Sequence, residues 1–531
     1  MNAVPLIFIF LPILIALLIY LIHRPWVSTL GFLCQGILSA ALFFYTRFVQ
    51  TTGTHDIIVG PWSKAIGVGL KNDLLSLAFL WLTLLFWWVI LAYIWSDRKE
   101  DYKFLFFFFF LEGTFMGLLQ SNDLFNFFIF IDITTILSTI LIIYEKDGFA
   151  IKSGVYYLLF NSVGMLFYQL GFIFIYSSMG TLNMTLLAER LALVPHSPLI
   201  RFSFLLFLVA VGVKSAIFPV YNWLPKAHSA APSAISALLS GLLVKSGLYA
   251  FLRIRTLFSF DFMNEFFFFL GLFSALSGVI FALSQKDLKQ ILAYHTVSQI
   301  GLIVMGISQS NTQLYLGGIT HLINHALFKA LLFLCAGIII HHYQKRRVTE
   351  IRGVFRTMPF VSITMLIAMI SITGGFLTNG YISKSLLTYG LAEHANWVRF
   401  LFQVINLGTM ASFLKISQIF FGPALQNKKQ VNPGQWFAIG TLALACLAIP
   451  WVYQPLGTIF GLHISHVSLF TSEKLLIYLI QATLGFGLVR WLMKKEPKPV
   501  RAIRHFQLSF GASNALMLLF LLLMIAAADL L

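Results

Sequence analysis

The sequence predicts an all-α, polytopic membrane protein with about 14–16 transmembrane helices. Of its 531 residues, 59% are hydrophobic and only 10% are charged, and the mean hydropathy is +0.86. A water-soluble core cannot cover that much apolar surface, so lipid must be the solvent for much of the chain. The apolar residues are also grouped in runs of about 18 to 25, the length that one spanning helix needs.

About sixteen such runs follow one another along the chain. The first has neither a basic leading segment nor a small-residue cleavage site, so we expect it to be retained as a helix. The longest loops, near 47–73, 178–200 and 452–473, leave no room for a soluble domain, and no phosphate loop or Rossmann fingerprint occurs. The runs lie at about 4–22, 27–46, 74–95, 104–120, 124–144, 153–177, 203–222, 231–252, 263–284, 290–308, 314–340, 360–390, 400–421, 436–452, 474–489 and 511–528.

Basic residues are distributed unevenly between the two sets of loops. If the N-terminus lies outside, most of the 36 Lys and Arg residues fall in the odd-numbered loops, with the largest groups at 345–356 and 490–504. The positive-inside rule then places both termini on the outer side of what we expect to be a bacterial inner membrane. The net charge of +17 is therefore a topology signal, and no basic soluble face indicates nucleic-acid binding.

Five ionisable residues lie well inside apolar runs: Asp132, Lys214, Lys245, Lys329 and Lys384. Charges at the bilayer centre are costly, and they usually line a bundle interior or an ion path. Lysine suits proton transfer because a desolvated ammonium can release its proton, whereas arginine stays charged. The structural alternatives are salt bridges that fix helices together and, for Asp132, a neutral acid satisfied by a neighbouring helix.

His321, His325 and Lys329 are spaced by four residues, so they share one face of a helix. The row extends ~12 Å along the axis at 1.5 Å per residue. With waters between the side chains, it is a candidate proton wire. Two histidines at this spacing also suit zinc, but no third ligand is evident and we expect no metal site. Cys34, Cys335 and Cys446 lie in apolar runs at unrelated spacings, so no disulfide framework is expected either.

Glu112, His228 and Lys415 are secondary candidates. Glu112 lies mid-span in the run before Asp132, and His228 lies in a proline-rich segment, so both are candidate supporting or access residues. Lys415 is closer to the end of its run, where snorkelling to the interface is an equal alternative. We expect Asp73 and Asp123, at the edges of runs, to be helix caps or interface anchors.

Two apolar runs are interrupted, each close to a lysine. After Lys214 come Pro219, Pro225 and Pro232, and proline removes a backbone donor and breaks a helix. The second interruption, 374–380, precedes Lys384. Broken helices in two halves of a transporter indicate its binding or transport site.

Several of these segments are similar to motifs of one family, the antiporter-like subunits of respiratory complex I, membrane-bound hydrogenases and Mrp-type cation/proton antiporters. The resemblance covers roughly 70–420, and the Leu-Pro-Lys-Ala-His-Ser-Ala-Ala-Pro form that ends at Pro232 most resembles the D-type Mrp subunits. The motifs are Gly212–Pro232, Ser236–Lys245, Lys286–Gly301 and His321–Phe333.

This resemblance implies a fourteen-helix core with two inverted five-helix repeats, in which helices seven and twelve are broken. It divides the chain into N-terminal helices at 1–103, a first transport repeat at 104–255, a second at 256–425, and C-terminal helices at 426–531. It also implies a hydrophilic axis through the membrane, formed here by Asp132, Lys214, Lys245, His321, His325, Lys329 and Lys384.

Three positions depart from the family pattern. The helix-five acid is Asp132 where glutamate is usual, so we expect its contact with Lys214 to be weaker or water-bridged. Thr373–Phe376 replaces the usual proline-containing sequence of the second break. Glu112 is unexpected in the fourth helix, and we expect it to supplement Asp132.

The leading functional hypothesis is the proton-conducting subunit of a Na⁺ or K⁺/proton antiporter complex, working with other membrane subunits. The alternatives are a proton-pumping subunit of a complex I- or hydrogenase-type redox complex, a subunit of a proton-coupled inorganic carbon uptake complex, and a non-transporting scaffold. No cofactor site is recognisable, so we expect a transporter rather than an enzyme, and any redox chemistry would belong to partner subunits.

Overall fold

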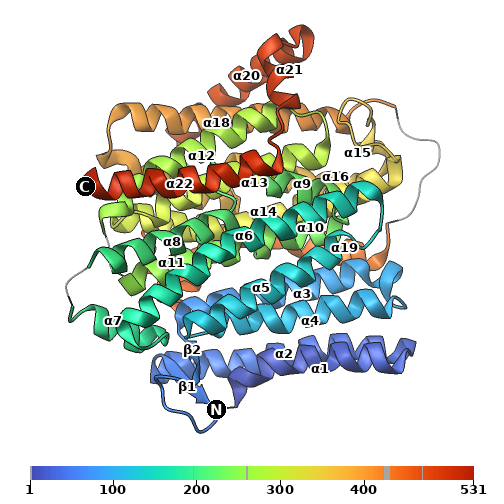
Figure 1. Ribbon diagram of the computed structural model, residues 1–531. Helices are drawn as coiled ribbons and strands as arrows, with labels where there is room; N and C mark the ends of the chain where they lie inside the picture. Colours follow the sequence, from blue (N-terminus) through green and yellow to red (C-terminus); the bar gives the residue numbers. More distant parts are fainter. Residues whose placement is uncertain (1–2, 195–196, 259–260, 424–430, 469–470, 531) are drawn as a thin grey trace.

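The computed structural model describes residues 3–194, 197–258, 261–423, 431–468 and 471–530. Its long helices run side by side (Figure 1). The first half comprises α1 (Val4–Ile22), α2 (Pro25–Thr52), α3 (Leu74–Arg98), α4 (Tyr102–Gln120), α5 (Leu124–Ile142), α6 (Gly148–Met179), α7 (Met184–Leu191), α8 (Pro198–Lys214), α9 (Trp223–Ala230), α10 (Ser233–Leu238), the π-helical turn η1 (Leu239–Leu243) and α11 (Lys245–Phe258).

The second half is also helical. It comprises η2 (Asp261–Met263), α12 (Asn264–Ser284), α13 (Leu288–Ile307), α14 (Thr312–Tyr343), α15 (Val354–Thr357), α16 (Pro359–Thr373), α17 (Asn379–Gly390), η3 (Leu391–Glu393), α18 (Asn396–Ser417), η4 (Gln418–Phe420), α19 (Pro433–Ile459), α20 (Ser472–Lys495), α21 (Lys498–His505) and α22 (Phe510–Leu530).

The predicted fold class is confirmed. Within the described residues, 14 helical segments are long and apolar enough to cross a membrane. They correspond to all the predicted runs except 203–222 and 360–390, which are the two interrupted ones. Helix α1 starts and α22 ends at the same end of the bundle, to the left in Figure 1. The prediction that this end faces outward uses basic residues that include Lys428 and Lys429, which lie outside the described residues.

Two of the long predicted loops contain regular structure. After α2 the chain forms an antiparallel hairpin of β1 (His55–Val59) and β2 (Val68–Asn72), and α7 lies in the second loop. The β-branched run Ile57–Val59 favours a strand, and it is too short to appear as a membrane span. The Gly69 carbonyl of β2 accepts from the Asn122 amide at 2.8 Å, so the hairpin packs against the junction between α4 and α5.

Asp73 and Asp123 are helix caps, as predicted. Asp73 caps α3 through the Ser76 amide at 2.9 Å, and Asp123 caps α5 through the amides of Phe125 and Asn126. Asp73 also binds the Arg253 guanidinium through both oxygens, at 2.5 and 2.7 Å, which ties α3 to α11. Burial raises the pKa of the Asp73 carboxyl, but the bonds and charge of Arg253 hold it below its ordinary value.

The first break begins directly after Lys214, where α8 ends. Backbone groups freed at membrane depth need partners because lipid offers none. The Phe218 amide donates to Ser274 Oγ of α12 at 3.0 Å, and the Val213 carbonyl accepts from the Trp223 indole at 2.8 Å. Side chains from α9 and α12 therefore satisfy backbone groups of this break.

The second break separates α16 from α17. Asn379, the first residue of α17, fixes the end of this break: its carbonyl accepts from Asn324 Nδ2 of α14 at 2.7 Å, and its side-chain oxygen accepts from Ser371 Oγ of α16. Gly374, at a φ of 83°, has the left-handed conformation that favours glycine. A Cβ on Gly374 would lie 2.8 Å from Lys384 Cδ, so glycine also leaves room for that lysine.

Helices α12 and α13 pack with their backbones close together. A Cβ added to Gly301 of α13 would lie 2.4 Å from the Ala275 nitrogen and 2.5 Å from the Gly271 oxygen, both on α12. Small residues allow this approach between membrane helices, where close van der Waals packing replaces the hydrophobic effect. The contact fixes the position of α13, which contributes residues to the candidate site.

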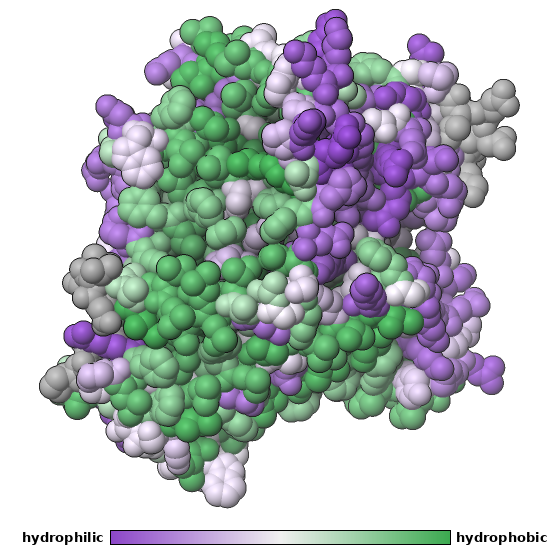
Figure 2. All heavy atoms as spheres, turned by 45° about the horizontal axis from the view of Figure 1, so that its top comes forward, coloured by the Kyte–Doolittle hydropathy of each residue, from purple (hydrophilic) through white to green (hydrophobic). Residues whose placement is uncertain are grey.

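Hydrophilic residues are not evenly spread over the surface. Figure 2 shows them densest around α21 and the neighbouring helix ends, while hydrophobic residues cover the flank of the bundle. Among the described residues, α20 and α22 are the least covered spans, with 11% and 22% of their apolar windows buried. Lipid or partner subunits must therefore cover this flank.

We predict that Gly301→Ala destabilises the protein, because the new methyl group overlaps the backbone of α12. Overpacking of this kind costs about 1–3 kcal/mol and lowers the melting temperature by a few degrees, measured by thermal unfolding of the detergent-purified protein. The control is Gly36→Ala on α2, where a Cβ meets nothing within 4 Å. Equal melting temperatures for the two variants would contradict the close packing of α12 and α13.

Candidate functional site

All the lysines predicted to lie inside apolar spans are buried. Their exposed fractions are 5% for Lys214, 0% for Lys245, 0% for Lys329, 6% for Lys384 and 8% for Lys415. None of them takes part in an ion pair within the described part of the chain. Their ammonium groups instead bind neutral oxygen and nitrogen atoms. This pattern disfavours the alternative of fixed salt bridges between helices.

Lys214 is the last residue of α8, and its Nζ donates to Thr135 Oγ1 of α5 at 2.5 Å. Thr135 lies one helical turn after Asp132, which is half-buried and close enough to interact with Lys214 through its charge. The structure thus places the two predicted partners on facing helices, with a threonine hydroxyl as the direct contact. The ring of Tyr157 lies 5.8 Å from Lys214 Nζ and closes another side of this site.

Lys245 follows the π-helical turn η1. In this wide turn the Val244 amide donates to the carbonyl of Leu239, five residues earlier. The carbonyl of Ser240 accepts from Lys245 Nζ. Such turns are rare and occur frequently at functional sites. Lys245 Nζ also lies 2.7 Å from Nδ1 of His325, so α11 and α14 are joined by a direct lysine–histidine hydrogen bond.

The predicted row on α14 is present, and its side chains contact α11, α13 and α17. His321 bonds Ser383 of α17 at 2.9 Å through Nδ1 and Gln299 of α13 at 3.1 Å through Nε2. The rings of His321 and His325 are 6.4 Å apart between centroids, and Nε2 of His325 has no hydrogen-bond partner in the described chain. Lys329 Nζ donates to the Leu292 carbonyl of α13 at 2.5 Å.

Lys384 lies on α17, after the second break, and its Nζ donates to Asn406 Oδ1 of α18 at 2.9 Å. It lines a small cavity of about 90 Å³ between α17, α18 and α20, together with Gln403, Lys474 and Gln481. The neighbouring residue Ser383 bonds His321, so the α14 row and the lysine of α17 meet at adjacent positions.

The predicted axis is therefore partly connected by direct bonds. Direct contacts join Lys245 to His325 and His321 to Ser383 beside Lys384. Within the described residues, no hydrogen bond joins Lys214 to Lys245 or Lys329 to Lys384, so proton transfer there requires water or side-chain motion. Electrostatic interaction does reach between Lys245 and Lys329.

The secondary candidates have separate environments. Glu112 is fully buried and accepts from Gln35 Nε2 of α2 at 2.9 and 2.8 Å. His228 stacks on Phe333 with ring centroids 4.6 Å apart, and both its ring nitrogens lack partners in the described chain. Lys415 donates to three carbonyls at the end of α12, of Ala282, Leu283 and Gln285, which is the position where a cation stabilises a helix.

His295 of α13 is a candidate that sequence reasoning missed. It is fully buried, its ring lies 4.9 Å from that of Phe413, and neither ring nitrogen has a hydrogen-bond partner among the described residues. The charged groups that act on it are Lys329, Lys415 and Lys384. It is therefore close enough to Lys329 and Lys384, which no hydrogen bond joins among the described residues, for both charges to act on it. The available indication in the sequence was a histidine within the apolar run 290–308.

No group of three or more potential metal ligands occurs in the part of the chain that the structure describes. His321 and His325 use ring nitrogens for Gln299, Ser383 and Lys245 instead. The arrangement offers proton donors and acceptors along the interior of the bundle.

Comparison with known proteins identifies one family. Residues 121–409 match the family model described as "NADH:quinone oxidoreductase/Mrp antiporter, TM". The D-type Na(+)/H(+) antiporter subunit of Alkalihalophilus pseudofirmus is 31% identical over 78% of this chain and 85% of its own. The D-type subunit of Bacillus subtilis is 28% identical over 88% and 96%, and the N-type NADH-quinone oxidoreductase subunit of Desulforudis audaxviator is 27% identical over 81% and 90%.

Two solved structures have a similar fold. A chain of the Mrp complex from Dietzia sp. DQ12-45-1b superposes with a TM-score of 0.78 at 22% identity, covering 95% of this chain and 99% of that one. A chain of the membrane-bound sulfane sulfur reductase, an archaeal respiratory membrane complex, has the same TM-score and identity and covers 92% of this chain. At this identity the likeness concerns the fold.

We predict that His295→Phe lowers proton flux while the protein stays folded. Phenylalanine keeps the ring contact with Phe413 and removes two unpartnered ring nitrogens, so the melting temperature should be unchanged or higher. Loss of a positioned proton donor and acceptor should reduce flux by about tenfold or more, measured in vesicles with a pH-sensitive dye. The control is His394→Phe, because the His394 ring lies 4.6 Å from that of Phe268, outside the axis. Normal flux in His295→Phe would make His295 a packing residue.

A second prediction concerns Glu112, whose role as a supplement to Asp132 stays a prediction. Glu112→Gln keeps the shape of the side chain and its place beside Gln35, but it cannot hold an exchangeable carboxyl proton. If Glu112 supplements Asp132, flux in the same vesicle assay falls in Glu112→Gln and falls further when Asp132→Asn is added. Normal transport by Glu112→Gln would show that the carboxyl group only joins α2 to α4.

Proposed function

This chain belongs to the NADH:quinone oxidoreductase/Mrp antiporter transmembrane family, and on that premise we propose that it is the proton-conducting subunit of a Na⁺ or K⁺/proton antiporter complex. Family membership already makes it an antiporter-like, proton-translocating membrane subunit. The choice of a monovalent cation as the coupled ion is supported by its similarity to two proteins named as D-type subunits of Na(+)/H(+) antiporters.

The contact between Lys245 and His325 is the observation on which the proposal depends. At 2.7 Å one nitrogen must donate and the other accept, so the two groups share a proton and cannot both be fully protonated. Such a pair can receive a proton from one side and release it to the other. Both side chains are fully buried, so these transfers occur inside the bundle.

The neighbouring groups supply positions for the proton before and after this pair. Lys214 is the last residue before the first helix break, and Lys384 lies in the second turn of the helix that follows the second break. At both breaks freed backbone and polar side chains replace hydrocarbon. Each ammonium is held by a single hydroxyl or amide oxygen, of Thr135 and Asn406 respectively. A single neutral acceptor stabilises a proton without fixing it as a carboxylate would.

The half-buried position of Asp132 supports a multisubunit complex. A carboxylate partly exposed on the flank of a membrane bundle is costly when lipid surrounds it. A partner subunit packed on α5 would remove that cost and extend the polar axis beyond this chain. We further propose that 104–255 and 256–425 are the two transport repeats, since each includes one broken helix, and that both termini face the outside of a bacterial inner membrane.

A redox-driven proton pump is the second candidate. It is favoured by the similarity to the N-type subunit of NADH-quinone oxidoreductase and by the fold shared with a respiratory sulfur reductase complex. The same polar axis would carry the protons, and electron transfer in other subunits would drive their movement. The source of the driving force is what separates the two functions.

We predict that Lys214→Ala and Lys245→Ala abolish cation-dependent proton flux while the protein stays in the membrane. The assay is the collapse of a pH gradient by added NaCl or KCl in everted vesicles that contain the whole complex, and immunoblotting measures the amount of protein. The matched control is Lys99→Ala, an exposed lysine after α3. Unchanged flux in both buried-lysine variants would favour the scaffold function.

Removing the gene for this chain from an otherwise complete complex distinguishes antiport from redox-driven pumping. For an antiporter, NaCl or KCl no longer collapses the gradient when the chain is absent. If cations have no effect with the chain present, but acidification driven by a quinone-linked electron donor depends on it, the redox function is correct.

A further inference from the structure

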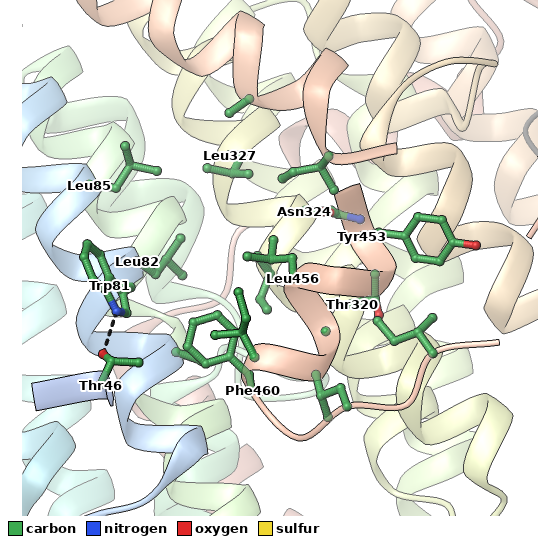
Figure 3. A pocket seen from close by; sticks show the side chains of 18 of the residues that line it. Thr46, Trp81, Leu82, Leu85, Thr320, Asn324, Leu327, Tyr453, Leu456 and Phe460 are labelled. Carbon is green, nitrogen blue, oxygen red and sulfur yellow. Dashed lines mark hydrogen bonds between the residues drawn. The ribbon is translucent and has the colours of Figure 1, made fainter. Parts of the chain in front are cut away.

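A cavity of about 490 Å³ lies between α2, α3, α14 and α19, apart from the proton axis. Figure 3 shows its wall, with Leu82 and Leu85 of α3 on one side, Leu327 of α14 above, and Leu456 and Phe460 at and beyond the end of α19 below. Two prolines inside α19, Pro450 and Pro455, remove backbone donors and favour a bend in the helix beside this cavity. The cavity is therefore a feature of the packing of these helices.

Most buried polar groups in the cavity wall already have hydrogen-bond partners in the protein, so an occupant needs to supply few. Trp81 Nε1 donates to Thr46 Oγ1 at 3.0 Å, and Asn324 Nδ2 donates to the Asn379 carbonyl at 2.7 Å. Tyr453 is bonded to the backbone of Ser465 and Val467. Among the buried polar side-chain atoms of the described residues that line the cavity, only the hydroxyl of Thr320 has no hydrogen-bond partner. The preferred occupant of such a space is hydrocarbon.

The dimensions fit one hydrocarbon chain. Between Ala445 and Ile459, which both line the cavity, α19 rises about 21 Å at 1.5 Å per residue, comparable with one leaflet of a hydrocarbon core ~30 Å thick. A methylene group fills roughly the 30 Å³ share of one liquid water, so the cavity takes about sixteen, the length of an acyl chain.

Arg47 gives this cavity a charged end. It lines the cavity near the end of α2, it is exposed, and its guanidinium lies 5.8 Å from the ring of Phe43. It forms no ion pair among the described residues. Its place within a few residues of the helix end matches the headgroup level, where a guanidinium binds phosphate with two parallel bonds.

We propose that this cavity binds one acyl chain of an anionic phospholipid, whose phosphate is held by Arg47. The chain would lie against Thr320, Asn324 and Leu327, on the same helix as His321 and His325. A lipid would thus support α14 from the side away from Lys245. The site does not depend on which ion the complex exchanges.

The test is fluorescence quenching by lipids with dibrominated acyl chains. The full-length protein is reconstituted in nanodiscs with increasing fractions of brominated phosphatidylglycerol or brominated phosphatidylcholine. The chain has 11 Trp residues, so the contribution of Trp81 is obtained by subtracting the quenching of Trp81→Phe. We expect Trp81 to be half-quenched at about a fivefold lower fraction of phosphatidylglycerol, the preference that one basic residue near a membrane surface gives.

Three variants separate this site from ordinary lipid contact. Arg47→Gln should remove the preference for phosphatidylglycerol, and Arg201→Gln, an exposed arginine at the start of α8, should retain it. Ala445→Phe fills the cavity without removing a contact, so it should protect Trp81 from both lipids. Equal quenching by the two lipids in the wild type, a preference that survives Arg47→Gln, or no quenching of Trp81 by either lipid would each overturn the proposal.

Discussion

The structure depends on one constraint: each lysine ammonium group that is buried away from water needs a hydrogen-bond acceptor inside the helix bundle. Each buried lysine donates to a neutral acceptor: a threonine hydroxyl, a backbone carbonyl, an imidazole or an amide oxygen. Regular helices offer few such acceptors, because their carbonyls are already bonded within the helix. The π-helical turn leaves the Ser240 carbonyl to accept from Lys245, and the other buried lysines reach acceptors on neighbouring helices: Thr135 on α5, Leu292 on α13 and Asn406 on α18.

The same constraint explains why the hydrogen-bond partners of Lys214 and Lys245 are not carboxylates. A close buried ion pair is difficult to separate once formed. Lys214 contacts Thr135 and lies near Asp132 without an ion pair, and Lys245 contacts His325, which is itself a proton acceptor. In the proposed function, these contacts would hold a proton inside the bundle and allow it to leave.

Helix α14 connects the parts of this arrangement. Its row of His321, His325 and Lys329 contacts α17, α11 and α13, and Asn324 secures the second break. The close approach of α12 and α13 at Gly301 holds Gln299 and His295 near that row. The cavity lies on another side of α14, so the helix that contributes three residues to the proposed proton axis is also the one whose packing the proposed acyl chain would complete.

The sequence by itself determined the spans, the buried lysines, the two breaks and the family. These features depend on local composition and spacing: apolar run length, four-residue steps, and prolines and glycines beside lysines. Only the tertiary structure decided the partners. The bonds of Lys245 to His325, Lys214 to Thr135 and Glu112 to Gln35 join residues 77 to 80 positions apart. The hairpin after α2 and the position of His295 also depend on how helices pack. A sequence shows which side chains need a partner in lipid, but the partner is whichever atom the packed helices bring within about 3 Å.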